Sequence, residues 1–170
     1  MNRRSILNLT AMAVLGLGVL PGNAIGQPKS LKEQLLGAWT LVSIDYVRQD
    51  GSRFQTYGAN PKGVARFDGS GHYIIAVMRS DRPPFAVNDR MQGTAEENKA
   101  TVQGTMTHFG TYTVSEAERT ILVHIESSSF PNWNGTDPKW LFTLTGDELK
   151  VTSPATTGGG TAEVVWKRAN

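Results

Sequence analysis

The pattern of apolar and polar residues along the chain predicts a protein built mainly from β-strands. Short segments with apolar residues at alternate positions recur along the chain, and turn-forming residues bound most of them. The predicted strands span residues 39–47, 53–57, 63–67, 72–79, 106–114, 119–127, 138–145, 147–153 and 161–168. Eight or nine antiparallel strands joined by short turns suit an up-and-down β-barrel, so the expected fold class is all-β.

Two short helices are expected beside these strands. Ser30 begins a Ser-x-x-Glu capping-box pattern, which predicts a short N-terminal helix over residues 31–36. Thr94 begins the same pattern with threonine. It predicts one inserted helix that runs to about Gln103 and is ended by Gly104.

Residues 1–26 have the pattern of an export signal. Arg3 and Arg4 precede an uncharged apolar run, Ile6–Leu20, and small and turn-forming residues follow it. The run is shorter than the roughly 20 residues that a membrane-spanning helix needs. The adjacent arginines fit either a twin-arginine signal or an ordinary one, and the sequence leaves both open. We expect cleavage to leave residues 27–170 as a single domain that is periplasmic or secreted.

Removal of this signal changes the charge of the protein. The whole chain has 17 Lys and Arg residues against 15 Asp and Glu residues. Because the only charged residues of the signal are Arg3 and Arg4, the remaining domain has equal numbers of both signs. A neutral domain without a long basic run offers nucleic acid no electrostatic footprint. The chain also has no cysteine, which excludes disulfides, a thiol nucleophile and a thiolate metal site.

Several segments make the chain resemble the bacterial and fungal lipocalin-like domain family. They are Arg79–Phe85, Phe109–Tyr112 and His124–Asp137, together with the glycine-x-tryptophan element Gly37–Trp39. The resemblance covers residues from about 35 to 168. It implies a lipocalin-like β-barrel and a small organic ligand or substrate, since some fungal members look associated with the making of small aromatic natural products.

The resemblance also implies a structural role for Trp39. In lipocalins a tryptophan on the first strand closes one end of the barrel, and an arginine of the last strand packs over it. Arg168 or Lys167 is the expected partner here. His108 departs from the family's usual pattern, because an aromatic residue such as tyrosine is common at its position.

His124 and Glu126 are the strongest local argument for catalysis. Two residues apart on a strand, they share one face, and a nearby carboxylate can orient an imidazole and raise its basicity. The register between the strands at 106–114 and 119–127 decides whether His108 lies on the same face as His124 and Glu126. It does so if the numbers of paired residues have an even sum, and it lies on the opposite face if the sum is odd. Alternation with Val123 and Ile125 places the pair on the outer surface instead. The resemblance favours a pair that faces the lumen, and we adopt that expectation.

The segment before a rigid pair of prolines supplies further candidates. Arg79 and Arg82 are expected at the mouth of the barrel, where an arginine can fix a carboxylate or phenolate of a ligand. Phe85 would lie beside them. In the alternative interpretation, one of the arginines pairs with Asp81 and Phe85 plugs one end of the barrel.

A second loop carries Phe130, Asn132 and Trp133. Trp133 could stack on an aromatic ligand while Asn132 gives it a hydrogen bond. In the alternative, Asn132 binds the backbone of its own loop and Trp133 covers the core. His108 and Tyr112 complete the set of expected ligand contacts.

Three functions remain open at this point. The first is an exported lipocalin-like barrel that binds a small apolar or aromatic molecule in its lumen. The second is a cofactor-free isomerase, cyclase or lyase. In it His124 would move a proton, Glu126 would orient that histidine, and Arg79 would stabilise negative charge. The third is an envelope interaction module whose barrel is filled by its own side chains.

The expected partner is a small hydrophobic or aromatic molecule. We expect no nucleic acid and no stable membrane span once the signal is removed, and the sequence leaves the oligomeric state open. We also expect no cofactor and no metal. No phosphate-binding loop or hydrolase motif occurs, and the three histidines are far apart in the sequence.

Overall fold

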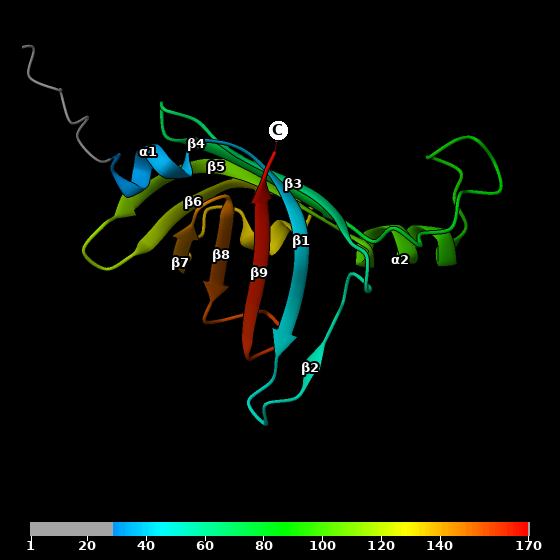
Figure 1. Ribbon diagram of the computed structural model, residues 1–170. Coiled ribbons are helices and arrows are strands. Elements are labelled where there is room, and N and C mark those ends of the chain that lie inside the picture. The colour runs from blue at the N-terminus through cyan, green and yellow to red at the C-terminus, as the bar shows by residue number, and fades with distance from the viewer. Residues whose placement is uncertain (1–28, 170) are drawn as a thin grey trace, which may run out of the picture.

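A computed structural model describes residues 29–169 of the chain, and Figure 1 shows it as a ribbon. Eight antiparallel strands close into a barrel, in which β1 pairs with β9, and β2 adds one short strand beside β1. The strands are β1 (Gly37–Val47), β2 (Arg53–Phe54), β3 (Lys62–Phe67), β4 (His72–Met78), β5 (Thr105–Ser115), β6 (Thr120–Ser128), β7 (Lys139–Thr145), β8 (Glu148–Ser153) and β9 (Thr161–Arg168). The helices are α1 (Leu31–Leu35), α2 (Ala95–Gln103) and the 3-10 helix η1 (Pro131–Trp133).

This architecture confirms the expected all-β, lipocalin-like barrel with two helices. Both predicted capping boxes are present: in each, the Ser or Thr side chain accepts from the backbone of the Glu, whose carboxylate accepts in return. The strand expected over 53–57 is shorter, because only Arg53 and Phe54 pair with β1. The expected export signal lies outside the described residues.

One end of the barrel is closed by α1 and by Trp39. The Trp39 side chain is fully buried, and its indole N–H donates to the carbonyl oxygen of Leu35 at 2.9 Å. The guanidinium carbon of Arg168 lies 4.2 Å from the centre of the Trp39 ring. The expected arginine partner is therefore Arg168, and the neighbouring Lys167 is exposed.

The hairpin of β5 and β6 contains a β-bulge that changes which residues face inward. Gly110 pairs with Ile125, but Phe109 pairs with Ser127, so Glu126 has no partner on the neighbouring strand. The paired residue numbers have an odd sum on one side of this bulge and an even sum on the other. Such a bulge leaves one strand with an extra residue and shifts its inward face by one position.

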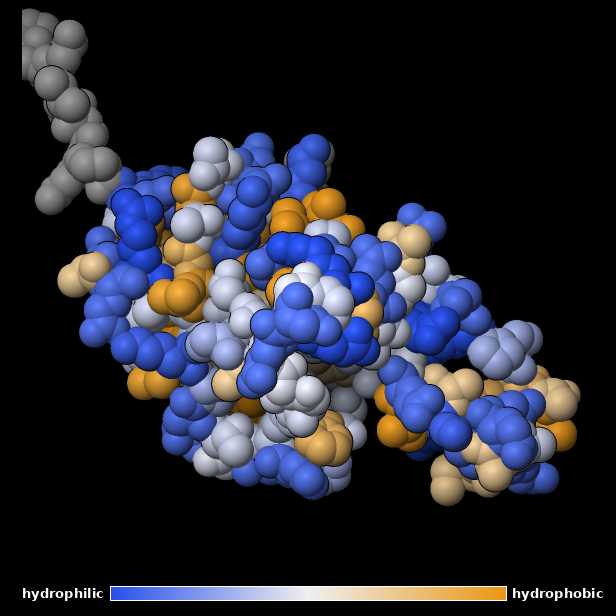
Figure 2. Space-filling view, turned by 90° about the horizontal axis from the view of Figure 1, so that it is seen from below, coloured by the Kyte–Doolittle hydropathy of each residue, from blue (hydrophilic) through white to orange (hydrophobic). Residues whose placement is uncertain are grey.

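Between β4 and β5 the chain leaves the barrel as an arm, residues 79–104, that carries α2. Figure 1 shows this arm projecting to the side, and Figure 2 shows it as a separate lobe on which apolar and polar residues are mixed. At its base the backbone N–H of Arg79 donates to the carbonyl oxygen of Gly104 at 2.9 Å. No residue of α2 is buried, so the arm is set apart from the core of the barrel.

Candidate functional site

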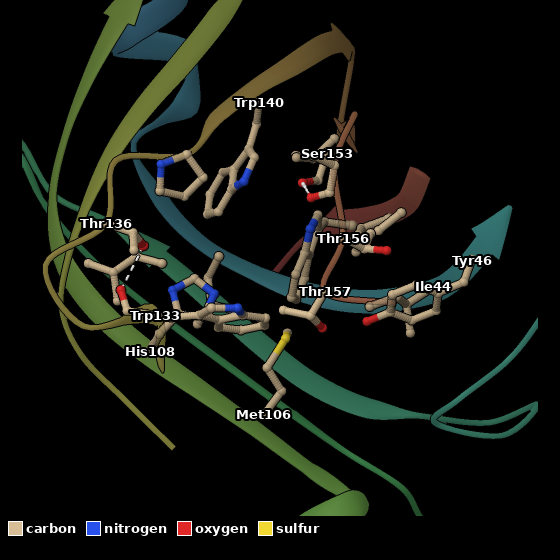
Figure 3. Close-up of a pocket in the computed structure, with 18 of the residues that line it drawn as sticks. Ile44, Tyr46, Met106, His108, Trp133, Thr136, Trp140, Ser153, Thr156 and Thr157 are labelled. Carbon is tan, nitrogen blue, oxygen red and sulfur yellow. Dashed lines mark hydrogen bonds between the residues drawn. The ribbon is translucent and has the colours of Figure 1, made fainter. Parts of the chain in front are cut away.

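A cavity of about 370 Å³ occupies the half of the barrel opposite to α1. Its walls come from the C-terminal halves of β1 and β8, the N-terminal halves of β5 and β9, and the loops that precede β7 and β9. Figure 3 shows the side chains that line it. They are mostly aromatic and aliphatic, with the larger ones Ile44, Tyr46, Phe67, Ile75, Met106, His108, Ile125, Trp133, Trp140, Val151, Val164 and Trp166.

His108 is a buried ionisable group of the lining that has aromatic rings on three sides. Its imidazole lies edge-on to Tyr73, Trp133 and Trp140, with ring centres 5.5, 5.9 and 5.8 Å away. In Figure 3, His108 and Trp133 lie on one side of the cavity and Tyr46 on the other. Edge-to-face contacts of this kind favour a fixed ring orientation, so His108 is held in place at the wall.

Burial determines the charge of this histidine. Only 4% of His108 is exposed, and desolvation lowers the pKa of its imidazole to about 4. The side chain is therefore neutral near pH 7. Its Nδ1 atom lies 2.9 Å from the hydroxyl oxygen of Tyr73, whose pKa burial raises. The two side chains form a neutral, hydrogen-bonded pair.

The rest of the lining carries no formal charge. Among the described residues, no Asp, Glu, Lys or Arg side chain lines the cavity. Burial raises the pKa of Tyr46, and the hydroxyl of Tyr57 offsets this only in part, so Tyr46 is also neutral near pH 7. The cavity is therefore an uncharged, largely apolar space.

Three hydroxyl groups at the rim of the cavity hold the loops that surround it. Thr136 donates to the carbonyl oxygen of Trp133 at 2.6 Å, in the loop between β6 and β7. In the loop between β8 and β9, Ser153 donates to Ala155 at 3.2 Å and Thr156 donates to the Gly159 carbonyl at 2.8 Å. These hydroxyl hydrogens are used within the loops.

Local sequence explains how Trp133 reaches the cavity. Pro131 stands at the start of η1, where its missing N–H costs nothing, and the N–H of Trp133 donates to the carbonyl of Phe130 at 3.0 Å. Past η1 the backbone returns to β6. There the N–H of Gly135 donates to the carbonyl of Ile125 at 2.7 Å, and the N–H of Ile125 donates to the carbonyl of Thr136 at 3.0 Å. The loop is thus fixed to β6, and Trp133 lies against the cavity.

Of the residues predicted to contact a ligand, the structure places His108 and Trp133 in the lining. Phe130 packs on Trp133 from outside, with ring centres 5.6 Å apart, and is 41% exposed. Asn132 is exposed on the loop surface. Tyr112 is buried in the closed half of the barrel, where its hydroxyl donates to the carbonyl of Asp68 at 2.7 Å. Tyr112 therefore supports the core rather than the cavity.

His124 and Glu126 do not face the lumen as expected. Both are exposed on the outer surface, because the register on their side of the bulge turns Val123 and Ile125 inward. His124 is paired through its Nδ1 atom with Asp137 at 2.9 Å, and not with Glu126. The alternation of apolar residues, and not the resemblance, indicated the correct face.

Arg79, Arg82 and Phe85 also lie away from the cavity, because all of them belong to the arm. Arg79 forms a two-bond pair with Asp81, at 2.9 and 2.8 Å, as the alternative interpretation proposed. Arg82 donates to the carbonyl of Arg79 at 3.1 Å and to the hydroxyl of Thr105 at 2.9 Å. Phe85 does not plug the barrel: it is half-buried within the arm.

Sequence reasoning missed most of the cavity wall. Tyr46, Trp140 and Trp166 are inward positions of ordinary alternating strands, and such residues look the same whether they fill a core or border a space. Tyr73, which binds His108 from the neighbouring strand, was missed for the same reason. The signal in the sequence that could have indicated an aromatic cavity wall was the group of three tryptophans, Trp133, Trp140 and Trp166, in the C-terminal part of the chain.

Two absences within residues 29–169 concern metals and membranes. In that part of the chain, no three His, Cys, Asp or Glu side chains lie together in a way that could hold a metal ion. No helix within it is long and apolar enough to cross a membrane.

The chain matches the sequence model of a known family. The sequence model of a lipocalin-like domain matches residues 36–169, which include all nine strands and the lining of the cavity. A comparison with curated proteins finds no match to this chain.

Proposed function

The chain belongs to the lipocalin-like domain family, and from this we propose that its barrel binds a small apolar or aromatic molecule in the cavity. The cavity itself carries the proposal. Its volume of about 370 Å³ lies in the range of small-molecule sites, which are concave, mostly apolar and supplied with few polar groups. His108 is such a polar group, set among aromatic rings.

Apolar burial supplies the affinity in this proposal. A ligand that buries about 200 Å² of apolar surface against the indole rings of Trp133, Trp140 and Trp166 gains roughly 5 kcal/mol before the cost of association. Offset or edge-on stacking on these rings adds about 1 kcal/mol for each good contact. Three good ring contacts bring the total to about 8 kcal/mol, and an association cost of at least about 4 kcal/mol leaves binding near the millimolar range as the expected strength.

The other two candidate functions have less support. The proposed catalytic residues do not converge on a substrate: His124 and Glu126 are exposed on the outer face of β6, whereas Arg79 belongs to the arm and pairs there with Asp81. The interaction module requires a barrel filled by its own side chains. The cavity beside His108 is evidence against such a filled barrel.

Export is part of the same proposal. The basic and then apolar pattern of residues 1–26 supports delivery to the periplasm or the medium, where the barrel would meet its ligand. The test is to express the full gene, separate the periplasmic fraction, and determine the N-terminus of the protein found there. A protein retained in the cytoplasm with Met1 intact would contradict this part.

Binding is tested with N-phenyl-1-naphthylamine, a neutral aromatic probe whose fluorescence rises in apolar surroundings. The purified protein should bind it, and Trp133→Ala should weaken binding about tenfold, because a wall of the cavity is lost. The matched control is Phe109→Ala, which removes an aromatic ring from the outer face of the barrel, where 44% of Phe109 is exposed.

Mass spectrometry of the protein purified under native conditions would identify any molecule retained in the cavity. Absence of probe binding by a folded protein, or equal losses in Trp133→Ala and Phe109→Ala, would remove the support for the cavity as the binding site.

A further inference from the structure

The side-chain nitrogen atoms that remain free in the cavity are hydrogen-bond donors, while the hydroxyls of Tyr46 and Thr157 in the same lining can both donate and accept. Of the four tryptophans, Trp39 donates its indole N–H to a backbone carbonyl, whereas the other three line the cavity and have no partner among residues 29–169. In that range no fully enclosed side-chain nitrogen or oxygen lacks a hydrogen bond. The indole nitrogens of Trp133, Trp140 and Trp166 therefore border open space, and an indole nitrogen only donates.

His108 adds a fourth donor of the same kind. The hydroxyl of Tyr73 is hydrogen-bonded to Nδ1 of His108 and has no second hydrogen-bond partner within residues 29–169. If the imidazole donated to this hydroxyl, the hydroxyl hydrogen would be left in the core without an acceptor, which costs more than an unfilled lone pair. Tyr73 therefore donates to Nδ1, and the proton of the neutral imidazole is on Nε2. Nε2 has no hydrogen-bond partner in the described chain and is not fully enclosed, so it borders open space, which for His108 is the cavity that this residue lines.

No group in the lining can balance a charge on a ligand. The hydroxyl hydrogens of Thr136, Ser153 and Thr156 are bound to backbone carbonyls, and acidic and basic side chains are absent from the described lining. A carboxylate moved into such a space loses its hydration without gaining a cation, which is a large cost. A hydrocarbon pays no such cost, but it leaves the donors unpaired.

We propose that the cavity selects flat, neutral aromatic carbonyl compounds, such as aryl ketones or quinones, whose oxygen accepts from Nε2 of His108 and from the indole N–H groups. This selectivity rests on the proposed binding function and makes it more specific. The aromatic part of the ligand lies against the rings of the wall, and the oxygen faces His108. Tyr73 is a positioning residue in this arrangement, because it acts on the ligand only through the tautomer of His108.

The test ranks three probes of the same ring system by their displacement of N-phenyl-1-naphthylamine at about pH 7.5. They are 2-acetylnaphthalene, 2-ethylnaphthalene and 2-naphthoate: a neutral ketone, a hydrocarbon of similar shape and a carboxylate. We expect the ketone to displace the dye at a concentration about fivefold lower than the hydrocarbon, the effect of one net hydrogen bond. The carboxylate should need a concentration at least about tenfold higher than the ketone.

Two variants assign the preference to His108. His108→Phe keeps an aromatic ring but removes the N–H, so the ratio between ketone and hydrocarbon should fall toward that given by the indoles alone, about twofold. Tyr73→Phe removes the hydroxyl that keeps the proton of His108 on Nε2, so both tautomers become accessible. This variant should reduce the same ratio while the dye still binds. His124→Gln changes an exposed histidine outside the cavity and should leave the ratio as it is in the parent protein.

Nitrogen NMR of the histidines in the parent protein tests the donor without any substitution, which matters if His108→Phe does not fold. A proton on Nε2 of His108 supports the proposal, and a proton on Nδ1 overturns it. If the hydrocarbon or the carboxylate displaces the dye at the same concentration as the ketone, the proposed selectivity is overturned. The proposed binding function would still stand in that case. If neither the dye nor any of the three probes binds to the folded protein, both proposals fail.

Discussion

The guanidinium group of Arg168 covers the ring of Trp39 at 4.2 Å and donates to two carbonyl oxygens at the end of α1. Its Nη1 atom binds the carbonyl of Leu36 at 3.0 Å, and Nη2 binds that of Gln34 at 2.7 Å. One side chain of the last strand therefore holds the first strand and the helix that closes the barrel. The planar fork of arginine makes these three contacts together, and lysine has no such geometry.

Substitution of this arginine should be costly for stability. Arg168→Ala should lower the free energy of unfolding by about 2–3 kcal/mol, and Arg168→Lys by about 1–2 kcal/mol, because backbone carbonyls lose charged donors. Urea denaturation measures both. Arg66→Ala, at an exposed position of β3, is the control and should change the value by less than about 0.5 kcal/mol. Equal effects at the two positions would contradict the assigned role.

Gly110 should tolerate no side chain. A Cβ atom built there would overlap the backbone carbonyl oxygen of His124 at the bulge, and a backbone atom cannot move aside as a flexible side chain can. We expect Gly110→Ala to destabilise the protein by more than about 3 kcal/mol or to prevent folding. Gly69→Ala is the matched control, since nothing lies within 4 Å of its added Cβ. A stable Gly110→Ala protein would show that the close approach is not needed.

The buried imidazole of His108 should make stability fall as the pH is lowered. Its pKa is about 4 in the folded protein and about 6.5 when exposed, so between these values the unfolded chain binds the extra proton. Stability attributable to this group is fully present above about pH 6.5 and is lost progressively as the pH falls toward 4. From about pH 7.5 to pH 5 the loss should be about 2 kcal/mol.

The measurement for this pH effect is urea denaturation at several pH values, on the parent protein and on His108→Gln. The difference between the two separates the histidine from the acidic residues, which titrate in the same range. His72→Gln, at an exposed position, serves as the control and should follow the parent. A parallel pH dependence of parent and His108→Gln would show that this imidazole does not titrate as expected.

Ligand binding should not depend on the residues of the discarded catalytic arrangement. Arg79→Gln removes an exposed pair with Asp81 in the arm, and His124→Gln removes a surface pair with Asp137. Both should bind N-phenyl-1-naphthylamine within about twofold of the parent protein, and each should lose less than about 1 kcal/mol of stability. A tenfold loss of affinity in either variant would mean that the ligand extends outside the barrel.

Arg82 should control how firmly the arm is held. Its guanidinium joins the carbonyl of Arg79 to the hydroxyl of Thr105 and also contacts the sulfur of Met78 at 3.2 Å. Arg82→Ala should speed hydrogen exchange across residues 79–104 while exchange in the barrel strands stays slow. Arg90→Ala, at an exposed position of the same arm, should leave the exchange pattern unchanged. Uniformly faster exchange throughout the barrel would contradict a local role.

The fold was largely predictable because each of its elements has a local cause. Alternating apolar positions gave the strands, and two capping boxes gave the helices. The partner of Trp39 needed the resemblance, since no local pattern joins residues so far apart. The predicted length of β2 was wrong. A strand ends where its pairing with a neighbour ends, and the extent of pairing between β2 and β1 cannot be read from the residues of β2 alone.

The site was much less predictable, and the bulge at Glu126 explains part of this. One extra residue changes the inward face within a single strand, so His108 and His124 follow different rules of alternation. The remaining part follows from volume. Whether Trp140 and Trp166 meet across a filled core or border a cavity depends on how the side chains of all the strands pack together. The alternation within one strand carries no information on the total volume that these side chains fill.

The base of the arm has a consequence for how this protein varies. Met78 and Thr105 form the last pair of β4 and β5, and the hydrogen bond from Arg79 to Gly104 places the two ends of the arm side by side. To the barrel, residues 79–104 are therefore equivalent to a hairpin turn. A tight turn inserted in their place would leave the strand order and register intact. We therefore expect that a whole element can be gained, lost or replaced in this segment while the order and register of the barrel strands are kept.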